Sequence, residues 1–375
     1  MRIPLVDLAS QHAEIADDVR SGMERVFKEA AFVGGPEVAA FEAEYAEYIG
    51  VEHCVGVANG TDALELAMRV AGVGPGDEVI LPANTFIATA EAVSRIGAVP
   101  VLVDVDEEHL LIDPAAVERA VTPRTRAVAP VHLFGQTAFV EQLVDLASTY
   151  RLAVIEDAAQ SQGARRHGRP AGSWGTVAAT SFYPGKNLGA AGDAGAVLTD
   201  DPEAAAAVRI LGSHGSPAKY VHDVVGMNSR LDAVQAVYLR AKLARLNRWN
   251  DLRRRAARKY AELLADVGGV RLPEVALGNE DVWHLYVVRV DERDRVLAEL
   301  GAAGIGAGIH YPTPIHLTGA YASLGLGPGS FPVAERAARQ ILSLPMYPHL
   351  RQSDLEAVAE ALRAAVGPAG AGSKP

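Results

Sequence analysis

Residues 181–195 read Ser-Phe-Tyr-Pro-Gly-Lys-Asn-Leu-Gly-Ala-Ala-Gly-Asp-Ala-Gly and place one lysine, Lys186, among small residues just after an apolar run. That run, 178–182, is typical of a buried strand, and the Gly and Ala that follow let the backbone approach something bulky. A structural surface lysine needs neither feature. The segment therefore predicts a nucleophilic lysine beyond a strand end, with a surface lysine in a glycine-rich loop as the alternative.

A second strand end, Val-Ile-Glu-Asp at 154–157, precedes the lysine in the chain. A carboxylate at Asp157 could keep a pyridine nitrogen protonated, because an opposite charge in a poorly solvated site stabilises the cation. Lysine and carboxylate together indicate pyridoxal phosphate, an aldehyde cofactor that forms a Schiff base. Lys186 would then be both tether and proton carrier. A helix N-cap is the alternative for Asp157.

The apolar runs from about residue 50 to 200 alternate with helix-like segments, which predicts βαβ units and a mostly parallel sheet. The predicted strands are 79–82, 99–103, 127–131, 153–156, 178–182 and 195–199. The predicted helices are 61–70, 88–96 and 140–150. Continuous apolarity in the strands means that both faces of the sheet are covered. Ligands of such sheets gather at the carboxyl ends of the strands.

A long helical pattern at 232–265 leads out of this region. Beyond it we predict a strand at 282–290, a helix at 292–303 and a strand at 306–310. The fold class is thus α/β, with a large domain over 1–245, a small domain over 246–366 and a flexible tail over 367–375. The N-terminal residues could pack on the small domain. The basic run 248–259 is interpreted as a solvated helix face.

Composition excludes several classes of protein. A net charge of −11 over 375 residues argues against nucleic-acid binding. No segment approaches the length of a membrane span, and the N-terminus lacks a signal peptide. The single cysteine, Cys54, excludes an intramolecular disulfide and is expected to be a small buried residue. We expect a cytoplasmic protein with no metal site.

Further residues suit a phosphorylated ring. Gly60 and Thr61 precede a predicted helix, where free N–H groups and the helix dipole face a bound anion, although ordinary N-cap chemistry explains them equally well. Phe86 follows a strand and could stack on a planar ring, or it could be a core residue. Gln160 could hydrogen-bond the phenolic oxygen of the cofactor. Ser181 offers a hydroxyl to the phosphate.

Taken together, these motifs resemble the nucleotide-sugar aminotransferases of the DegT/DnrJ/StrS family. The likeness runs from residue 4 to about 349, nearly the whole chain. It implies a fold type I transferase with a mostly parallel seven-stranded sheet, in a homodimer whose active sites are shared between subunits. In that dimer Asn228 would reach the partner's cofactor phosphate. Helix capping is the alternative for Asn228 and Arg230.

The resemblance also assigns roles around the cofactor. It implies that Gly60, Thr61 and Ser181 hold the phosphate, that Phe86 stacks on the ring and that Gln160 meets its 3′ oxygen.

The stretches 181–190 and 309–317 are most similar to members that act on dTDP-3-keto-6-deoxyhexoses. The resemblance therefore implies amino transfer from L-glutamate to such a nucleotide sugar. The residues implied to hold the sugar and its pyrophosphate are Tyr183, Lys219, Tyr220, Arg230, His310, Tyr311 and His316. Ordinary loop residues are the alternative for these positions.

Other activities remain open. The nearest is amination of a dTDP-4-keto-6-deoxysugar, followed by a UDP-2-acetamido-3-keto sugar or a cyclitol ketone. A dehydrating branch of the family has histidine in place of the lysine, so Lys186 argues against it. A pyridoxal-binding regulator without turnover would carry an added DNA-binding domain and a basic surface, and the sequence shows neither.

Overall fold

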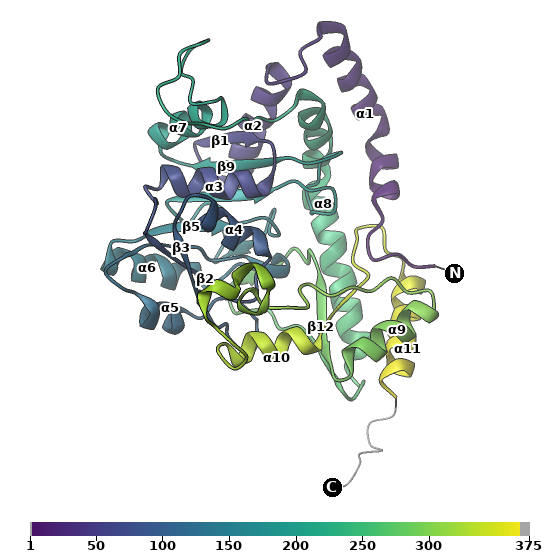
Figure 1. Ribbon diagram of the computed structural model, residues 1–375. Helices are drawn as coiled ribbons and strands as arrows, with labels where there is room; N and C mark the ends of the chain where they lie inside the picture. Colours follow the sequence, from purple (N-terminus) through teal and green to yellow (C-terminus); the bar gives the residue numbers. More distant parts are fainter. Residues whose placement is uncertain (1, 368–375) are drawn as a thin grey trace.

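A seven-stranded sheet forms the centre of the larger part of the molecule (Figure 1). The structure, a computed structural model, describes residues 2–367. The strand order is β1-β9-β8-β5-β4-β2-β3, and only β9 runs against the others. The strands are β1 His53–Val57, β2 Glu78–Pro82, β3 Val99–Val103, β4 Thr125–Val128, β5 Ala153–Asp157, β8 Val177–Ser181 and β9 Gly195–Thr199. The predicted α/β class with a mostly parallel sheet is confirmed.

Helices cover both faces of this sheet. Val79 and Leu81 of β2 pack in one apolar cluster with α3 (Gly60–Val70) and α4 (Ile87–Arg95). Ile80, between them, packs in another cluster with α5 (Pro114–Ala120) and α6 (Val140–Tyr150). This alternation is the two-residue period of a strand with both faces buried. The continuous apolarity of the strand sequences has this cause.

A third cluster covers the β1 edge of the sheet. It joins α2 (Pro36–Ile49) and the long helix α8 (Ala233–Leu264) to β1, β8 and β9. Cys54 of β1 is buried in it, as expected. The helix α1 (Leu8–Glu29) lies along α8, and α7 (Pro202–Gly212) precedes the exposed loop that leads to α8.

Helix α8 runs from the large sheet to a smaller antiparallel sheet (Figure 1). Its strands are β10 Val270–Arg271, β12 Tyr286–Val290 and β13 Ile341–Leu344, with α9 (Arg293–Ala302) and α11 (Gln352–Val366) packed in the same apolar cluster. The predicted boundary between the large and the small domain, at 245/246, stays a proposal. The predicted tail, 367–375, lies outside the described residues apart from Gly367.

Two predicted strands of this smaller part are wrong in extent or place. Residues 282–285 precede β12 without joining it, because Val282 and Leu285 donate their N–H groups to Gly135 and Phe134 of the large part. Residues 306–310 form only one bridge, Gly308 with Ser343. The strands beside β12 are instead β10 and β13, neither of which we predicted.

The solvated-face interpretation of the run 248–259 is wrong for Arg253. That side chain is 1% exposed and donates to the carbonyl oxygens of Trp283 at 3.2 Å and Met346 at 2.9 Å. Burial lowers the pKa of Arg253 to about 9. A guanidinium carries five donors and can satisfy several carbonyls at once, which explains an arginine where the helix meets the small sheet.

The N-terminal residues do pack on the small part. Ile3 bridges Ile305 in parallel, and the carbonyl of Leu5 accepts from Met346 N at 3.1 Å.

The remaining elements are α10 Pro332–Gln340, the short strands β6 Arg165–Arg166, β7 Arg169–Pro170 and β11 Asn279–Glu280, and the 3-10 turns η1 Leu133–Gly135, η2 Ile315–Leu317 and η3 Gly319–Leu324. Within residues 2–367, no helix has both the length and the apolarity to cross a membrane.

Candidate active site

A cavity of about 440 Å³ opens where β2, β5 and β8 end. Three chain segments that follow or close these strands reach it: residues 85–89 after β2, Asp157 at the end of β5, and Ser181 at the end of β8. Strands of a parallel sheet point their carboxyl ends to the same edge, so residues far apart in the chain meet there. The loop after β8 brings Lys186 to the same cavity.

Lys186 and Asp157 face this cavity together. Burial lowers the pKa of Lys186 to about 8, and the charge of Asp157 opposes that shift. Burial raises the pKa of Asp157, while a hydrogen bond from Thr89 is the largest opposing influence. The Asp157 side chain accepts from Thr89 Oγ1 at 2.8 Å and from Ala159 N at 3.2 Å. The site therefore holds an amine with a lowered pKa beside a carboxylate fixed in orientation.

A cradle for an anion lies at the start of α3. A Cβ at Gly60 would stand 2.5 Å from Ser181 Cβ, so only glycine lets the helix start so close to that hydroxyl. Asn59 caps the helix by accepting from Asp62 N at 2.8 Å. Gly60, Thr61 and Ser181 all line the cavity. Free N–H groups at a helix start and a hydroxyl suit a phosphate, so these residues fit a phosphorylated ring held between Asp157 and Lys186.

Two further predicted residues lie at the same cavity. Phe86 is half exposed, and its ring centroid lies 5.1 Å from that of Tyr311. Gln160 is buried, with Oε1 accepting from Phe134 N at 2.7 Å and Nε2 donating to the Tyr311 hydroxyl at 3.0 Å. The amide is held from both ends, and the second hydrogen of Nε2 stays available for a ligand.

Residues 13–363 match the DegT/DnrJ/EryC1/StrS aminotransferase family. The chain belongs to this family. It is 48% identical to dTDP-3-amino-3,4,6-trideoxy-alpha-D-glucose transaminase of Streptomyces venezuelae, over 96% of each chain. It is 49% identical to the erythromycin biosynthesis sensory transduction protein EryC1 of Saccharopolyspora erythraea, over 97% of this chain and 100% of that one.

Among solved structures, DesV of S. venezuelae in complex with a ketimine intermediate superposes with a TM-score of 0.96. That chain is 47% identical, and the match covers 98% of this chain and 100% of DesV. As a member of the DegT/DnrJ/EryC1/StrS family, the protein is an aminotransferase that depends on pyridoxal phosphate.

The residues predicted to hold the substrate, together with Asn228, which was predicted to reach the partner's cofactor phosphate, divide into two groups in this aminotransferase. Tyr183, His310 and Tyr311 line the cavity with Lys186. The residues that do not line it are Lys219, Tyr220, Asn228, Arg230 and His316. The first four of these lie on the exposed loop between α7 and α8, on the surface of the single chain.

His316 does not fit the predicted contact with the sugar. The side chain is buried, with Nε2 hydrogen-bonded to Glu335 at 3.0 Å and the ring packed edge-on against Phe331. The family resemblance of the stretch 309–317 implied a ligand residue at His316, but the short turn η2 directs the side chain into the protein.

Several cavity residues were missed by the sequence interpretation. Thr89 lies in the first turn of α4, close after the predicted strand end at residue 82, and that position could have suggested it. Leu5, Val6 and His284 also line the cavity. No local pattern points to these three, because they come from the N-terminus and from the approach to β12.

Glu156 anchors the end of β5 from the opposite face. Its carboxylate is fully buried and accepts from His132 Nε2 at 2.8 Å and from three backbone N–H groups, those of Gly172, Trp174 and Gly175. His132 Nδ1 accepts from Ala138 N, so the ring proton is on Nε2 and is donated to Glu156. Burial alone would raise the pKa of Glu156, but these hydrogen bonds lower it below its ordinary value.

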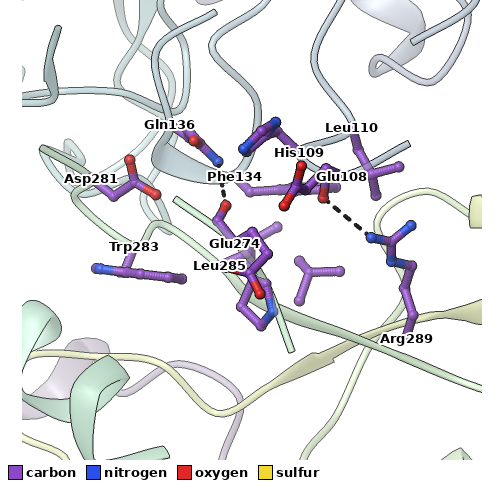
Figure 2. Close-up of a pocket in the computed structure, with 12 residues that line it drawn as sticks. Glu108, His109, Leu110, Phe134, Gln136, Glu274, Asp281, Trp283, Leu285 and Arg289 are labelled. Atoms are coloured by element: carbon purple, nitrogen blue, oxygen red, sulfur yellow. Dashed lines mark hydrogen bonds between the residues drawn. The ribbon is translucent and has the colours of Figure 1, made fainter. Parts of the chain in front are cut away.

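A second, smaller cavity, of about 30 Å³, is shown in Figure 2. Leu285 lines both cavities. Asp281 and Trp283 stand on one side of the small cavity and Arg289 on the other. Asp281 is 7% exposed, its Oδ1 has no hydrogen-bond partner, and burial raises its pKa to about 8 against the charge of Arg254. This carboxyl group is neutral over much of the pH range in which most carboxylates are charged.

Proposed function

We propose that this protein transfers the amino group of L-glutamate to C3 of a dTDP-linked 3-keto-6-deoxyhexose. The observation that carries the proposal is the meeting of Lys186 and Asp157 in one cavity of a DegT/DnrJ/EryC1/StrS aminotransferase. The choice of sugar is supported by the 48% identity to a dTDP-3-amino-3,4,6-trideoxy-alpha-D-glucose transaminase. The single, buried cysteine suits a reaction in the cytoplasm.

Bound pyridoxal phosphate supplies an electron sink for the carbon that carries the amine. Lys186 accepts the proton from that carbon of the donor and later returns a proton to the sugar carbon. A pKa of about 8 leaves part of the amine unprotonated near neutral pH, which suits a base. Asp157 would keep the ring nitrogen of the bound cofactor protonated, and Thr89 fixes the orientation of the carboxylate.

The remaining cavity residues bind and orient the cofactor and the sugar. Gly60, Thr61 and Ser181 hold the phosphate, Phe86 stacks on the ring and Gln160 donates to its 3′ oxygen. Tyr183, His310 and Tyr311 hold the sugar. Support comes from their common position on the cavity wall.

A homodimer completes the site. The loop between α7 and α8 exposes Tyr220 by 84% and Val225 by 93%, with Val224 half exposed beside them. Apolar side chains gathered on one exposed loop mark a protein contact, and a second copy is the usual partner. The same loop carries Lys219, Asn228 and Arg230, which would reach the partner's cavity. There Asn228 meets the phosphate and the two cations meet the pyrophosphate.

Mixing two inactive variants tests the shared site. Lys186→Ala removes the amine of one cavity, and Asn228→Ala removes the side chain offered to the partner's cavity. If sites are shared, hybrid dimers contain one intact site, and mixing after mild dissociation restores about a quarter of wild-type turnover. Absence of any restored turnover in dimers shown to have exchanged subunits would contradict the shared site.

The regiochemistry is tested with three substrates in parallel. Purified enzyme and L-glutamate are incubated with the 3-keto and the 4-keto forms of dTDP-6-deoxyglucose and with a UDP-2-acetamido-3-keto sugar. NMR then locates the new amine. We expect amination at C3 of the dTDP sugar. Conversion of the 4-keto compound alone would overturn the proposal.

The relative EryC1 is named a sensory transduction protein, and a regulator that binds pyridoxal phosphate without turnover is therefore the second candidate function. Borohydride reduction followed by peptide mapping shows whether Lys186 binds the cofactor. A turnover assay is needed as well, because an enzyme and a regulator would both carry the label. A regulator would carry the label at Lys186 without releasing 2-oxoglutarate from L-glutamate. We expect both the label and the release.

A further inference from the structure

His284 lines the cavity that holds Lys186, yet no role described so far uses it. It lies on the segment that approaches β12, and the neighbouring residues Val282 and Leu285 donate their N–H groups to Gly135 and Phe134. The backbone around His284 is therefore fixed to the large part of the molecule on both sides. The ring position is set by the fold rather than by a free loop.

A chain of amides determines how this imidazole is protonated. Asn250 Nδ2 on α8 donates to the Gln162 carbonyl at 2.9 Å, so its Oδ1 is the atom that faces Asn187. Asn187 Nδ2 donates to that Oδ1 and to the Val282 carbonyl, both at 2.9 Å. Both orientations are fixed by oxygen acceptors, which removes the usual ambiguity of amide groups.

The remaining oxygen, Asn187 Oδ1, lies 3.2 Å from His284 Nδ1. An amide oxygen only accepts, so Nδ1 must carry a proton and donate it. A neutral imidazole with its proton on Nδ1 has a lone pair on Nε2. Burial lowers the pKa of His284 well below its ordinary value, and the charges of Lys186, Arg253 and His310 act in the same direction. The ring is therefore neutral.

The second imidazole of the cavity, His310, is not fixed in this way. Its Nδ1 lies 2.9 Å from Ser343 Oγ, and a hydroxyl can donate or accept. Either tautomer of His310 satisfies that contact. His284 is thus the imidazole whose acceptor atom is specified by the structure.

Both side chains line one cavity. We propose that His284 is a positioning residue whose Nε2 accepts a hydrogen bond from the amino group of Lys186 in the pyridoxamine phosphate form of the enzyme. The proposal rests on the role of Lys186 given above. The acceptor holds the amine in the cavity while it carries a proton and stabilises its charged form. Burial favours the uncharged form, and the charge of Asp157 opposes that effect. The proposed hydrogen bond to His284 would oppose it further.

The first test is made on the wild-type enzyme, and a variant serves only to assign the resonances. Full-length enzyme containing pyridoxamine phosphate, in which Lys186 is free, is labelled with ¹⁵N-histidine, and the His284 resonances are assigned with His284→Phe. We expect ring shifts of the neutral tautomer with its proton on Nδ1 at neutral pH. A proton on Nε2, or an imidazolium, would overturn the proposal.

The second test measures Lys186 itself. NMR titration of the labelled lysine side chain, assigned with Lys186→Arg, gives its pKa in the same form of the enzyme. His284→Phe should lower that pKa by roughly one unit, the worth of a hydrogen bond to a charged group. His310→Phe is the matched control, because it removes an equal ring from the same cavity, and it should change the pKa much less.

Equal shifts in the two variants would show a general effect of polarity and would overturn the specific role of His284. Asn187→Leu provides a separate check, since it keeps the ring and removes the oxygen that fixes its tautomer. We expect the proton of His284 to redistribute between both nitrogens and the pKa of Lys186 to fall. None of these readouts involves a sugar or borohydride labelling, so the proposal can fail independently of the proposed function.

Discussion

Thr89 Oγ1 donates a hydrogen bond to Asp157 Oδ2 at 2.8 Å, and Thr85 Oγ1 lies 2.9 Å from Thr89 Oγ1. A hydroxyl has one proton, so a Thr89 that donates to the carboxylate must accept from Thr85. Thr85, just before α4, and Thr89, in the first turn of α4, form a short relay that ends on Asp157. This relay fixes which way the carboxylate faces the cavity.

Thr89→Val keeps the shape of the side chain and removes the donor. Asp157 should then become a weaker acid, because the hydrogen bond is the largest influence opposing its burial. We expect kcat to fall by roughly tenfold, since a hydrogen bond to a charged group contributes about 1.5 kcal/mol or more. Steady-state kinetics test this. Thr85→Val should have a smaller effect, and an unchanged kcat in Thr89→Val would count against the relay.

Gly60→Ala should weaken cofactor binding. The added Cβ would stand 2.5 Å from Ser181 Cβ and 3.1 Å from its backbone Cα, so the start of α3 must shift. We expect the Kd for pyridoxal phosphate to rise by about tenfold, equivalent to 1.4 kcal/mol. Fluorescence titration of the apoenzyme measures it. Gly72→Ala, at a site with open space around it but a positive φ of 79°, gives a comparison remote from the cavity, and it should leave the Kd unchanged.

Glu156→Gln should destabilise the protein at neutral pH by about 3 kcal/mol, because whichever way the amide turns, its NH₂ faces N–H donors. The folded-state pKa of Glu156 is lowered from 4.5, so the carboxylate stabilises the fold above that value and the contribution is lost as pH falls below it. Urea unfolding at several pH values tests both points. A difference between wild type and variant that grows in acid would contradict this account.

Asp281→Asn should stabilise the protein in alkaline solution. The folded-state pKa of about 8 lies above the ordinary 3.8, so wild-type stability is complete below pH 4 and declines as pH rises towards 8. Asparagine does not ionise, so the stability of the variant has no such decline. The variant should gain on the order of 2 kcal/mol above pH 8 and nothing near pH 4. Thermal unfolding at several pH values measures this difference. Glu274→Gln, an exposed change at the same small cavity, is the control.

Elements with a strong period could be predicted from the sequence. Helix 140–150 and strand 195–199 have the predicted bounds, because an amphipathic stripe and an unbroken apolar run are signals that a single segment carries. Lys186 and Asp157 meet for a reason that the sequence also contains. Asp157 ends one strand of the mostly parallel sheet, and Lys186 follows the end of another.

Other features depend on contacts between distant segments. The strand β13 is only four residues long and directly follows α10, so its sequence resembles the end of a helix. His284 acquires its place from hydrogen bonds between its neighbours and the loop 134–135, which no local pattern encodes. Lys219, Tyr220, Asn228 and Arg230 do not line the cavity of their own chain, so the roles proposed for them depend on a second subunit.

The path of the N-terminus has a practical consequence for handling the enzyme. Leu5 and Val6 form part of the cavity wall, and Ile3 is tied to Ile305. Any affinity tag fused ahead of residue 2 would begin within a few residues of the reacting groups. Purification handles and fluorescent labels are therefore better attached beyond α11, where they leave the entrance for the nucleotide sugar clear.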